Sequence, residues 1–224
     1  MNVLIVHAHP EPRSFVSALK DTAFTELGAS GHTVRIADLC AAGFDPRLTR
    51  ADFGAPADEA YFKPQREQQH ACEAGTLSAE IREHLDALFW AELVIFTFPL
   101  WWFSVPAILK GWFDRVLVMG EVYGGGKVHE TGGLAGRRAL LAFATGGPAA
   151  SYAPGGRNGT LAALLAPVQW GTLHFSGFGV LAPFVVPGPG RASDDDRAAV
   201  LAAWRARLRA IEHEAPIAIA PPGA

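Results

Sequence analysis

The chain has 224 residues, of which 50% are hydrophobic and only 18% are charged, and its formal net charge at pH 7 is −3. It has no Lys/Arg-rich run, which argues against a nucleic-acid partner or an anionic membrane surface. Its two cysteines, Cys40 and Cys72, give no disulfide framework and predict a cytoplasmic protein. The low charge suggests that a ligand or a second subunit covers part of an apolar surface.

Apolar runs and amphipathic segments alternate along the chain. In order, the expected elements are strand Val3–Val6, helix Ser14–Leu27, strand Thr33–Leu39, helix Leu77–Trp90, strand Leu93–Phe98, helix Ser104–Met119, strand Ala139–Ala144, strand Val180–Val186 and helix Ser193–Ile211. Strands that are apolar on both faces are typical of a parallel sheet covered by helices. The pattern therefore predicts an α/β fold with a doubly wound, five-stranded parallel sheet and helices on both faces.

The helix starts carry local signals. We expect Ser78 to cap one helix, and Ser104 to cap another with Pro106 in its first turn. The acidic run after Ser193 suits the positive end of a helix dipole.

Two long stretches, Arg47–Thr76 and Gly120–Gly136, show no regular pattern, and loops of this length are functional or disordered. We expect one domain over residues 1–218 and a frayed tail over 219–224. The uncharged run that starts at Leu93 contains Pro99 and Pro106, so we interpret it as strand, loop and helix and expect no integral membrane segment.

Ligands of doubly wound sheets bind beyond the carboxyl ends of the strands. After the first predicted strand, the sequence HAHPEPRSF makes a stiff turn into a helix N-terminus, whose free N–H groups attract an anion such as phosphate. Ser14 there either caps the helix or donates to a phosphate oxygen. His7 and His9 have the spacing of a metal-binding pair, but they lack further ligands, and we expect no metal site.

Two more strand ends are unusual. PLWWF follows the third predicted strand, and aromatic side chains in that position either stack on a planar ligand or pack on a partner subunit. After the fourth, Thr145, Gly146 and Gly147 let a backbone approach something flat, with the phenol of Tyr152 nearby. A phosphate-binding end and a flat aromatic slot together suit a flavin better than a lone nicotinamide.

These motifs resemble those of the NAD(P)H:quinone oxidoreductase (DT-diaphorase) family of flavodoxin-like flavoproteins. The resemblance runs from about Asn2 to Pro216 and is carried by FPLWWFSVPAILKGWFDRV, HAHPEPRSF, TLSAEI, ATGG with its following tyrosine, and GTLHFSGFGVLAP. It implies a homodimer with active sites at the interface, FAD as cofactor, and ping-pong transfer of hydride from NAD(P)H through flavin N5 to a quinone.

The resemblance also implies roles for individual residues. His9, Ser14 and Phe15 would meet the FAD diphosphate and ribose, and Arg197 would lie near the adenine. A second group would hold the isoalloxazine or line its polar edge: Pro99, Leu100, Trp102, Phe103, Thr145, Gly146, Gly147 and Tyr152. Tyr152, Gly146, Gly147 and Asn158 would form the catalytic group.

Three positions depart from the family pattern. Asn158 stands where a histidine often pairs with the tyrosine, and asparagine cannot take up a proton near neutral pH. Trp101 and Val16 replace residues that are commonly polar.

Two alternatives stay open at this point. The chain could be a flavin-binding ancillary subunit that regulates a membrane transport system, or an FMN-dependent azo or iron reductase. An adenine-end pocket formed by Arg47–Thr76 and Arg197 would favour FAD over FMN.

Overall fold

The apolar runs form one parallel sheet in the computed structural model, which describes residues 1–221. Its strands are β1 (Asn2–His7), β2 (Thr33–Asp38), β3 (Leu93–Pro99), β4 (Arg138–Thr145), β5 (Gly179–Val180) and β6 (Phe184–Pro187). The strand order is β2-β1-β3-β4-β5, with β6 also paired to β4, and all pairs are parallel. The predicted doubly wound sheet is confirmed, and its order reverses between β1 and β3, where such folds bind ligands.

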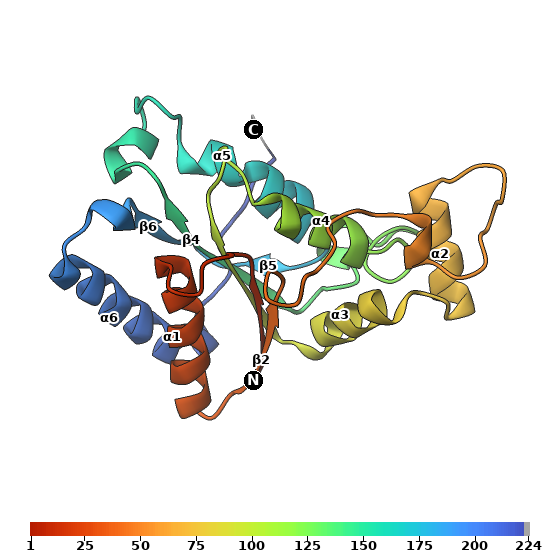
Figure 1. Ribbon diagram of the computed structural model, residues 1–224, viewed down its shortest axis with the longest axis horizontal. Helices are drawn as coiled ribbons and strands as arrows, with labels where there is room; N and C mark the ends of the chain where they lie inside the picture. Colours follow the sequence, from red (N-terminus) through yellow and green to blue (C-terminus); the bar gives the residue numbers. More distant parts are fainter. Residues whose placement is uncertain (222–224) are drawn as a thin grey trace.

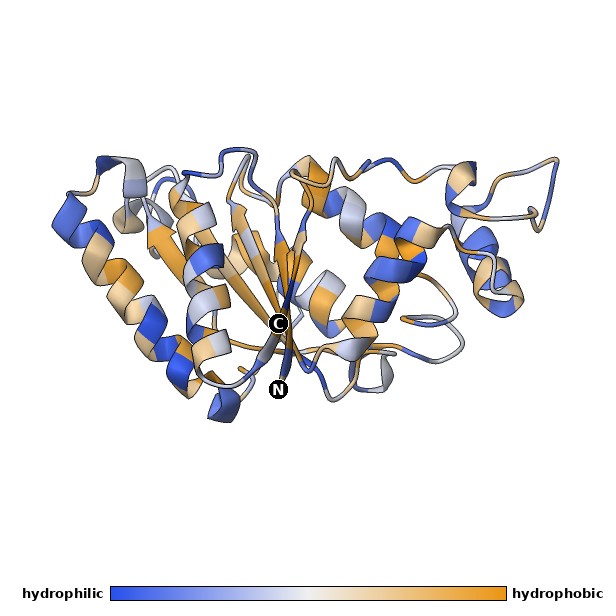
Figure 2. Ribbon diagram, turned by 60° about the horizontal axis from the view of Figure 1, so that its bottom comes forward, coloured by the Kyte–Doolittle hydropathy of each residue, from blue (hydrophilic) through white to orange (hydrophobic). Residues whose placement is uncertain are grey.

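Helices cover both faces of the sheet (Figure 1). They are α1 (Phe15–Ala29), α2 (Pro64–Ala74), α3 (Ala79–Trp90), α4 (Ala107–Val116), α5 (Leu161–Val168) and α6 (Asp194–Ala210). One apolar cluster joins the sheet to α1 and α6, and Trp204 Nε1 donates to the Leu19 carbonyl oxygen across it at 3.0 Å. The other cluster joins the opposite face to α3, α4 and α5. Figure 2 shows the resulting layers, with apolar strands between helices whose outer faces are polar.

The predicted strand Val180–Val186 is divided into β5 and β6. Leu181 still donates to the Ala139 carbonyl oxygen at 2.8 Å, but Pro183 has no N–H to donate, so the pairing with β4 stops and resumes at Phe184. The division leaves the fold class unchanged.

The expectation that Arg47–Thr76 is irregular was wrong in part, because α2 occupies its end. This helix is polar in sequence, and buried polar contacts fix it instead of an apolar stripe. Gln68 Nε2 donates to the Asp114 carbonyl oxygen at 3.2 Å, and Gln68 Oε1 accepts from the Met119 N–H at 3.1 Å. Such contacts leave no periodic signal in the sequence.

The predicted start of the helix at Ser104 was also wrong. The structure begins α4 at Ala107 after Pro106, which makes no side-chain cap. Ser104 is used instead to close a tight turn with Trp101. The cap predicted at Ser78 is confirmed, and Ser14 and Ser193 also cap their helices, since each of the three side chains accepts from the backbone N–H three residues later.

The C-terminal segment runs back along the sheet. Ile217 donates to the Val180 carbonyl oxygen at 2.9 Å, and Ile219 packs partly buried against the core. Residues 222–224 of the predicted tail lie outside the described residues, and the tail stays a prediction. Within residues 1–221, no helix combines the length and the apolar character needed to cross a membrane.

Candidate functional site

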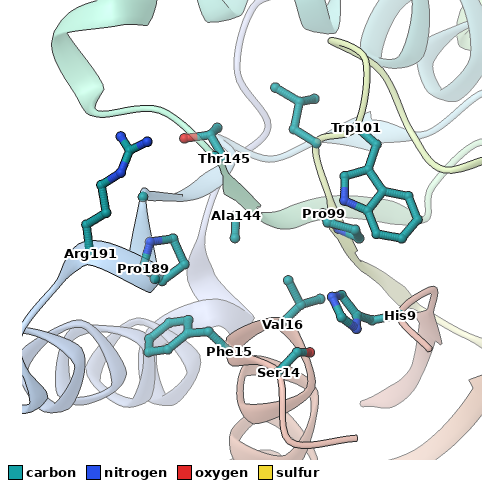
Figure 3. Close-up of a pocket in the computed structure, with 14 residues that line it drawn as sticks. His9, Ser14, Phe15, Val16, Pro99, Trp101, Ala144, Thr145, Pro189 and Arg191 are labelled. Atoms are coloured by element: carbon teal, nitrogen blue, oxygen red, sulfur yellow. The ribbon is translucent and has the colours of Figure 1, made fainter. Parts of the chain in front are cut away.

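A cavity of about 490 Å³ lies beyond the carboxyl ends of β1, β3, β4 and β6 (Figure 3). Its walls come from four loops, and the residues that line it are His9, Ser14, Phe15, Val16, Pro99, Leu100, Trp101, Ala144, Thr145, Gly146, Gly188, Pro189, Gly190 and Arg191. The site therefore forms where the topology of a doubly wound sheet places it.

The turn after β1 is held rigidly by its own side chains. Ser14 Oγ accepts from the Ser17 N–H at 3.0 Å, and His9 Nδ1 accepts from the Glu11 N–H at 3.0 Å. Burial lowers the pKa of His9 below its ordinary value, so its ring is neutral at pH 7. The wall of the cavity at this turn is a neutral imidazole, a hydroxyl and the start of α1, which together attract an anion.

The segment from Trp101 to Ser104 is a tight turn with two aromatic residues at its centre. The backbone groups of Trp101 and Ser104 bond to each other at 3.1 and 3.0 Å. Between them Trp102 has φ 50° and Phe103 has φ 59°. Positive φ at both central residues is the pattern of a type I′ turn, which ordinarily selects Asn-Gly.

This aromatic turn is strained and poorly covered. Left-handed backbone costs a residue with a side chain about 1–2 kcal/mol, and the Trp102 side chain is 95% exposed, so its own burial offsets none of that cost. Strain of this kind is concentrated at ligand-binding sites. The turn therefore leaves an exposed indole on strained backbone at the carboxyl end of β3.

The loop after β4 brings a second group together. Thr145 Oγ1 donates to the Gly147 carbonyl oxygen at 2.8 Å. A Cβ on Gly147 would lie 3.3 Å from Tyr152 Cε2 and 3.7 Å from Asn158 Nδ2, so these three residues are neighbours. Asn158 is fixed by its own N–H, which donates to the Ser151 carbonyl oxygen at 2.9 Å.

The structure gathers some of the predicted site residues in the cavity and leaves others beside it. Those that line it are His9, Ser14, Phe15, Pro99, Leu100, Thr145 and Gly146. The residues of the aromatic turn, Trp102 and Phe103, and the group Gly147, Tyr152 and Asn158 do not line it.

Arg197 stabilises the turn that follows β6 and does not line the cavity. Its guanidinium donates to the carbonyl oxygens of Pro189 (3.2 Å) and Ala192 (2.6 Å) and pairs with Asp194. Arg191, held in the turn that Arg197 braces, lines the cavity instead, as Figure 3 shows. Sequence reasoning missed Arg191, although its place just after a strand end was a usable signal.

Neither the long stretch Arg47–Thr76 nor a cluster of metal-binding side chains contributes to the cavity. No lining residue comes from that stretch. Among residues 1–221, no group of three or more His, Cys, Asp or Glu side chains could hold a metal ion.

The chain is similar in sequence to a known family and to individual proteins over nearly its whole length. The family described as having a flavodoxin-like fold matches residues 1–208. A ribosyldihydronicotinamide dehydrogenase (quinone) from Mus musculus is 45% identical, over 98% of this chain and 96% of its own length. An NAD(P)H dehydrogenase (quinone) 1 from Rattus norvegicus is 41% identical, over 97% of this chain and 80% of its own length.

A solved structure is also similar over the whole chain. A protein from Klebsiella pneumoniae, described as a quinone reductase, superimposes with a TM-score of 0.95 at 38% sequence identity. The match covers 100% of this chain and 90% of the Klebsiella chain.

Proposed function

This chain belongs to the flavodoxin-like family that includes the quinone dehydrogenases, and we propose that it is a flavin-dependent NAD(P)H:quinone oxidoreductase. The observation that carries the proposal is the strained aromatic turn beside the cavity. Trp102 and Phe103 hold a left-handed conformation that their side chains disfavour, at the strand end where a planar ligand would lie.

The residues present fit a flavin. The volume of about 490 Å³ is within the range of small-molecule sites, and its walls combine apolar side chains with a few polar groups. Pro99, Leu100 and the aromatic turn would hold the isoalloxazine ring, and the turn at Ser14 would hold a phosphate. When bound, a flavin takes two electrons from a reduced nicotinamide and gives them to a quinone.

The chain's own groups would orient and stabilise these reactants. The N–H groups of Gly146 and Gly147 and the phenol of Tyr152 would be the donors that stabilise negative charge on the bound flavin, Gly146 from the cavity wall and the other two from beside the cavity. Asn158, next to Tyr152, can donate a hydrogen bond but holds no proton that titrates near pH 7. These residues would therefore act by fixed hydrogen bonds, with no protein group titrating in a relay.

We propose FAD over FMN as the cofactor. Pro189 and Arg191 line the same cavity as Ser14 and Phe15, so the guanidinium of Arg191 would be available to the second phosphate of FAD. Arg197 would contribute indirectly, through the carbonyl oxygens it braces.

A homodimer would complete the site. Trp102 is 95% exposed and Tyr61 is 69% exposed, and the low content of charged residues is consistent with a covered apolar surface. Sedimentation equilibrium checks this point: we expect twice the chain mass of 23.8 kDa, and a monomer with bound flavin would refute it.

The function is tested by anaerobic absorbance spectroscopy on the purified protein. The flavin bands are recorded, then NADH, NADPH or ribosyldihydronicotinamide is added in separate runs, and menadione follows. We expect bleaching by a reduced nicotinamide and full recovery with the quinone, and the cofactor released by heating distinguishes FAD from FMN. A protein that neither retains nor takes up a flavin would refute the proposal, and a flavin that no donor bleaches would favour the regulatory alternative.

A further inference from the structure

A buried histidine lies directly beneath the turn that precedes α1. His7, the last residue of β1, is 1% exposed, and both ring nitrogens have partners. Nδ1 lies 2.8 Å from Thr97 Oγ1 on β3, and Nε2 lies 3.2 Å from Ser17 Oγ on α1. Because Thr97 and Ser17 are also fully buried, these contacts are shielded from water.

Ser17 continues the chain of hydrogen bonds to the surface of the cavity. Its hydroxyl donates to the Glu11 carbonyl oxygen at 2.8 Å, and its Oγ lies 3.0 Å from Ser14 Oγ. Ser14 lines the cavity and caps α1. The four side chains thus connect the middle of the sheet to the wall of the site.

The direction of each bond follows by elimination. The carbonyl oxygen of Glu11 can only accept, so the single hydroxyl proton of Ser17 is directed to it. Ser17 Oγ must then accept from the two other neighbours, His7 Nε2–H and the Ser14 hydroxyl. Burial lowers the pKa of His7 to about 4, so the ring is neutral at pH 7 and its bare Nδ1 accepts from the Thr97 hydroxyl.

This arrangement determines what Ser14 can do when an anion arrives. If its hydroxyl rotates outward to donate to a phosphate oxygen, Ser17 Oγ still has the N–H of His7 as a donor. Without that N–H, the same rotation would leave the buried Ser17 oxygen with no donor at all, and an unsatisfied buried polar atom is costly.

We infer that His7 is a positioning residue for phosphate. Its Nε2–H gives the buried Ser17 oxygen a hydrogen-bond donor, so that the Ser14 hydroxyl is free to bind the phosphate group of the flavin. The inference rests on the proposed function. It adds a role for His7 and Ser17, neither of which lines the cavity.

The test compares flavins with and without a phosphate. FMN and riboflavin share the isoalloxazine and ribityl groups, so the ratio of their dissociation constants isolates the phosphate. Each is titrated at pH 7 into flavin-free protein, with binding followed by quenching of flavin fluorescence.

The principal variant is the pair His7→Leu with Thr97→Val, which removes the donor to Ser17 without leaving an orphaned threonine hydroxyl. We expect its dissociation constant for FMN to rise roughly fivefold to tenfold, the scale of one buried hydrogen bond, while that for riboflavin stays unchanged. Thr97→Val alone and His7→Gln, whose amide N–H replaces Nε2–H, should both keep the wild-type ratio.

Ser17→Ala tests the same hydrogen bonds from the helix side: with the Ser17 oxygen gone, no buried acceptor is orphaned when Ser14 turns outward, so Ser17→Ala alone should keep the wild-type ratio and, added to the paired variant, should restore it. An unchanged ratio of FMN to riboflavin in the paired variant would overturn the inference, as would an equal loss for the two flavins or a loss that Ser17→Ala does not restore. A wild-type protein that binds FMN no more tightly than riboflavin would overturn it as well, although flavin binding itself would stand. If the wild type binds neither flavin, the proposed function fails first.

Discussion

At the scale of single residues, the site combines strained and buried groups that a stable scaffold alone would not require. Trp102 and Phe103 occupy positions where Asn-Gly would be preferred, and His7 is a titratable ring placed inside the sheet. Each feature lowers the free energy of unfolding, and that loss can be measured separately from flavin binding.

Replacing Trp102 should separate stability from function. Trp102→Asn puts a residue that tolerates left-handed backbone into the turn, so we expect the flavin-free protein to gain about 0.5–1 kcal/mol in urea unfolding. Flavin should bind more weakly because an aromatic ring is lost. Trp102→Phe is the matched control, with the strain retained and no gain expected. A loss of stability in Trp102→Asn would show that the exposed indole supports the fold.

The buried His7 should make stability depend on pH. Its folded pKa, about 4, is below the ordinary 6.5 because burial outweighs the attraction of Asp38. Between these values the unfolded state binds a proton that the folded state does not, so stability is complete above pH 6.5 and is lost as pH falls toward 4.

We expect the wild type to lose more unfolding free energy than His7→Gln between pH 7 and about pH 4.5, with a difference on the order of 2 kcal/mol. Urea unfolding of the two proteins at both pH values measures it. Equal losses of unfolding free energy in the two proteins would mean that His7 is hydrated or becomes protonated in the folded state.

Asn158 should leave the reaction insensitive to pH near neutrality. The rate of flavin reduction by a nicotinamide, followed by stopped-flow absorbance, is expected to be flat across the interval of about 6–7 where a histidine would titrate. Asn158→His should introduce a step in that interval. A step in the wild type that disappears in Asn158→Ala would contradict the assignment.

At the scale of elements, the close approaches of helices decide which substitutions are tolerated. α4 packs so tightly against the loop before α2 that a Cβ on Gly111 would lie 2.2 Å from the Pro46 carbonyl oxygen. Gly28 in α1 has nothing within 4 Å of its Cβ position. A methyl group added at Gly111 would therefore clash, whereas one added at Gly28 would not.

Alanine substitutions at these two positions should change the unfolding free energy in opposite directions. Gly111→Ala is expected to lower the unfolding free energy by about 1–3 kcal/mol through overpacking. Gly28→Ala should raise it by about 0.5–1 kcal/mol, since alanine favours the helix. Thermal and urea unfolding of both variants check the signs, and a stabilised Gly111→Ala protein would show that the loop at Pro46 moves away freely.

At the scale of the whole molecule, one buried ion pair fixes the long segment between β2 and α3. The guanidinium of Arg115 on α4 bonds to the carboxylate of Asp52 at 2.6 Å, with both side chains almost fully buried. Arg115 also donates to the Asp45 carbonyl oxygen at 2.6 Å and pairs with Glu80 at 2.7 Å. The segment that contains α2, drawn in orange at the right of Figure 1, is held to the domain through Arg115 in addition to the contacts of Gln68.

Removing the Arg115 side chain should therefore destabilise the folded protein strongly. Arg115→Ala leaves a buried carboxylate without its cation, and we expect a loss of about 3–5 kcal/mol in unfolding free energy. Lys110→Ala, which breaks the exposed pair with Asp114, should cost less than about 1 kcal/mol. Comparable losses in the two variants, measured by urea unfolding, would refute the anchoring role of Arg115.

Local sequence patterns were sufficient to predict the sheet, most of the helices and three of the four loops that line the cavity. Apolar runs such as Leu93–Phe98 and caps such as Ser14 are local patterns, and strand ends in a parallel sheet meet at one edge, so the position of the cavity followed from them. The remaining features became visible in the folded chain alone. α2 is fixed by Gln68, the aromatic turn by pairing of Trp101 with Ser104, and the chain from His7 to Ser14 by bonds between β1, β3 and α1. These features depend on contacts between residues distant in the chain or on backbone angles that the residue types disfavour, and neither leaves a periodic signal in the sequence.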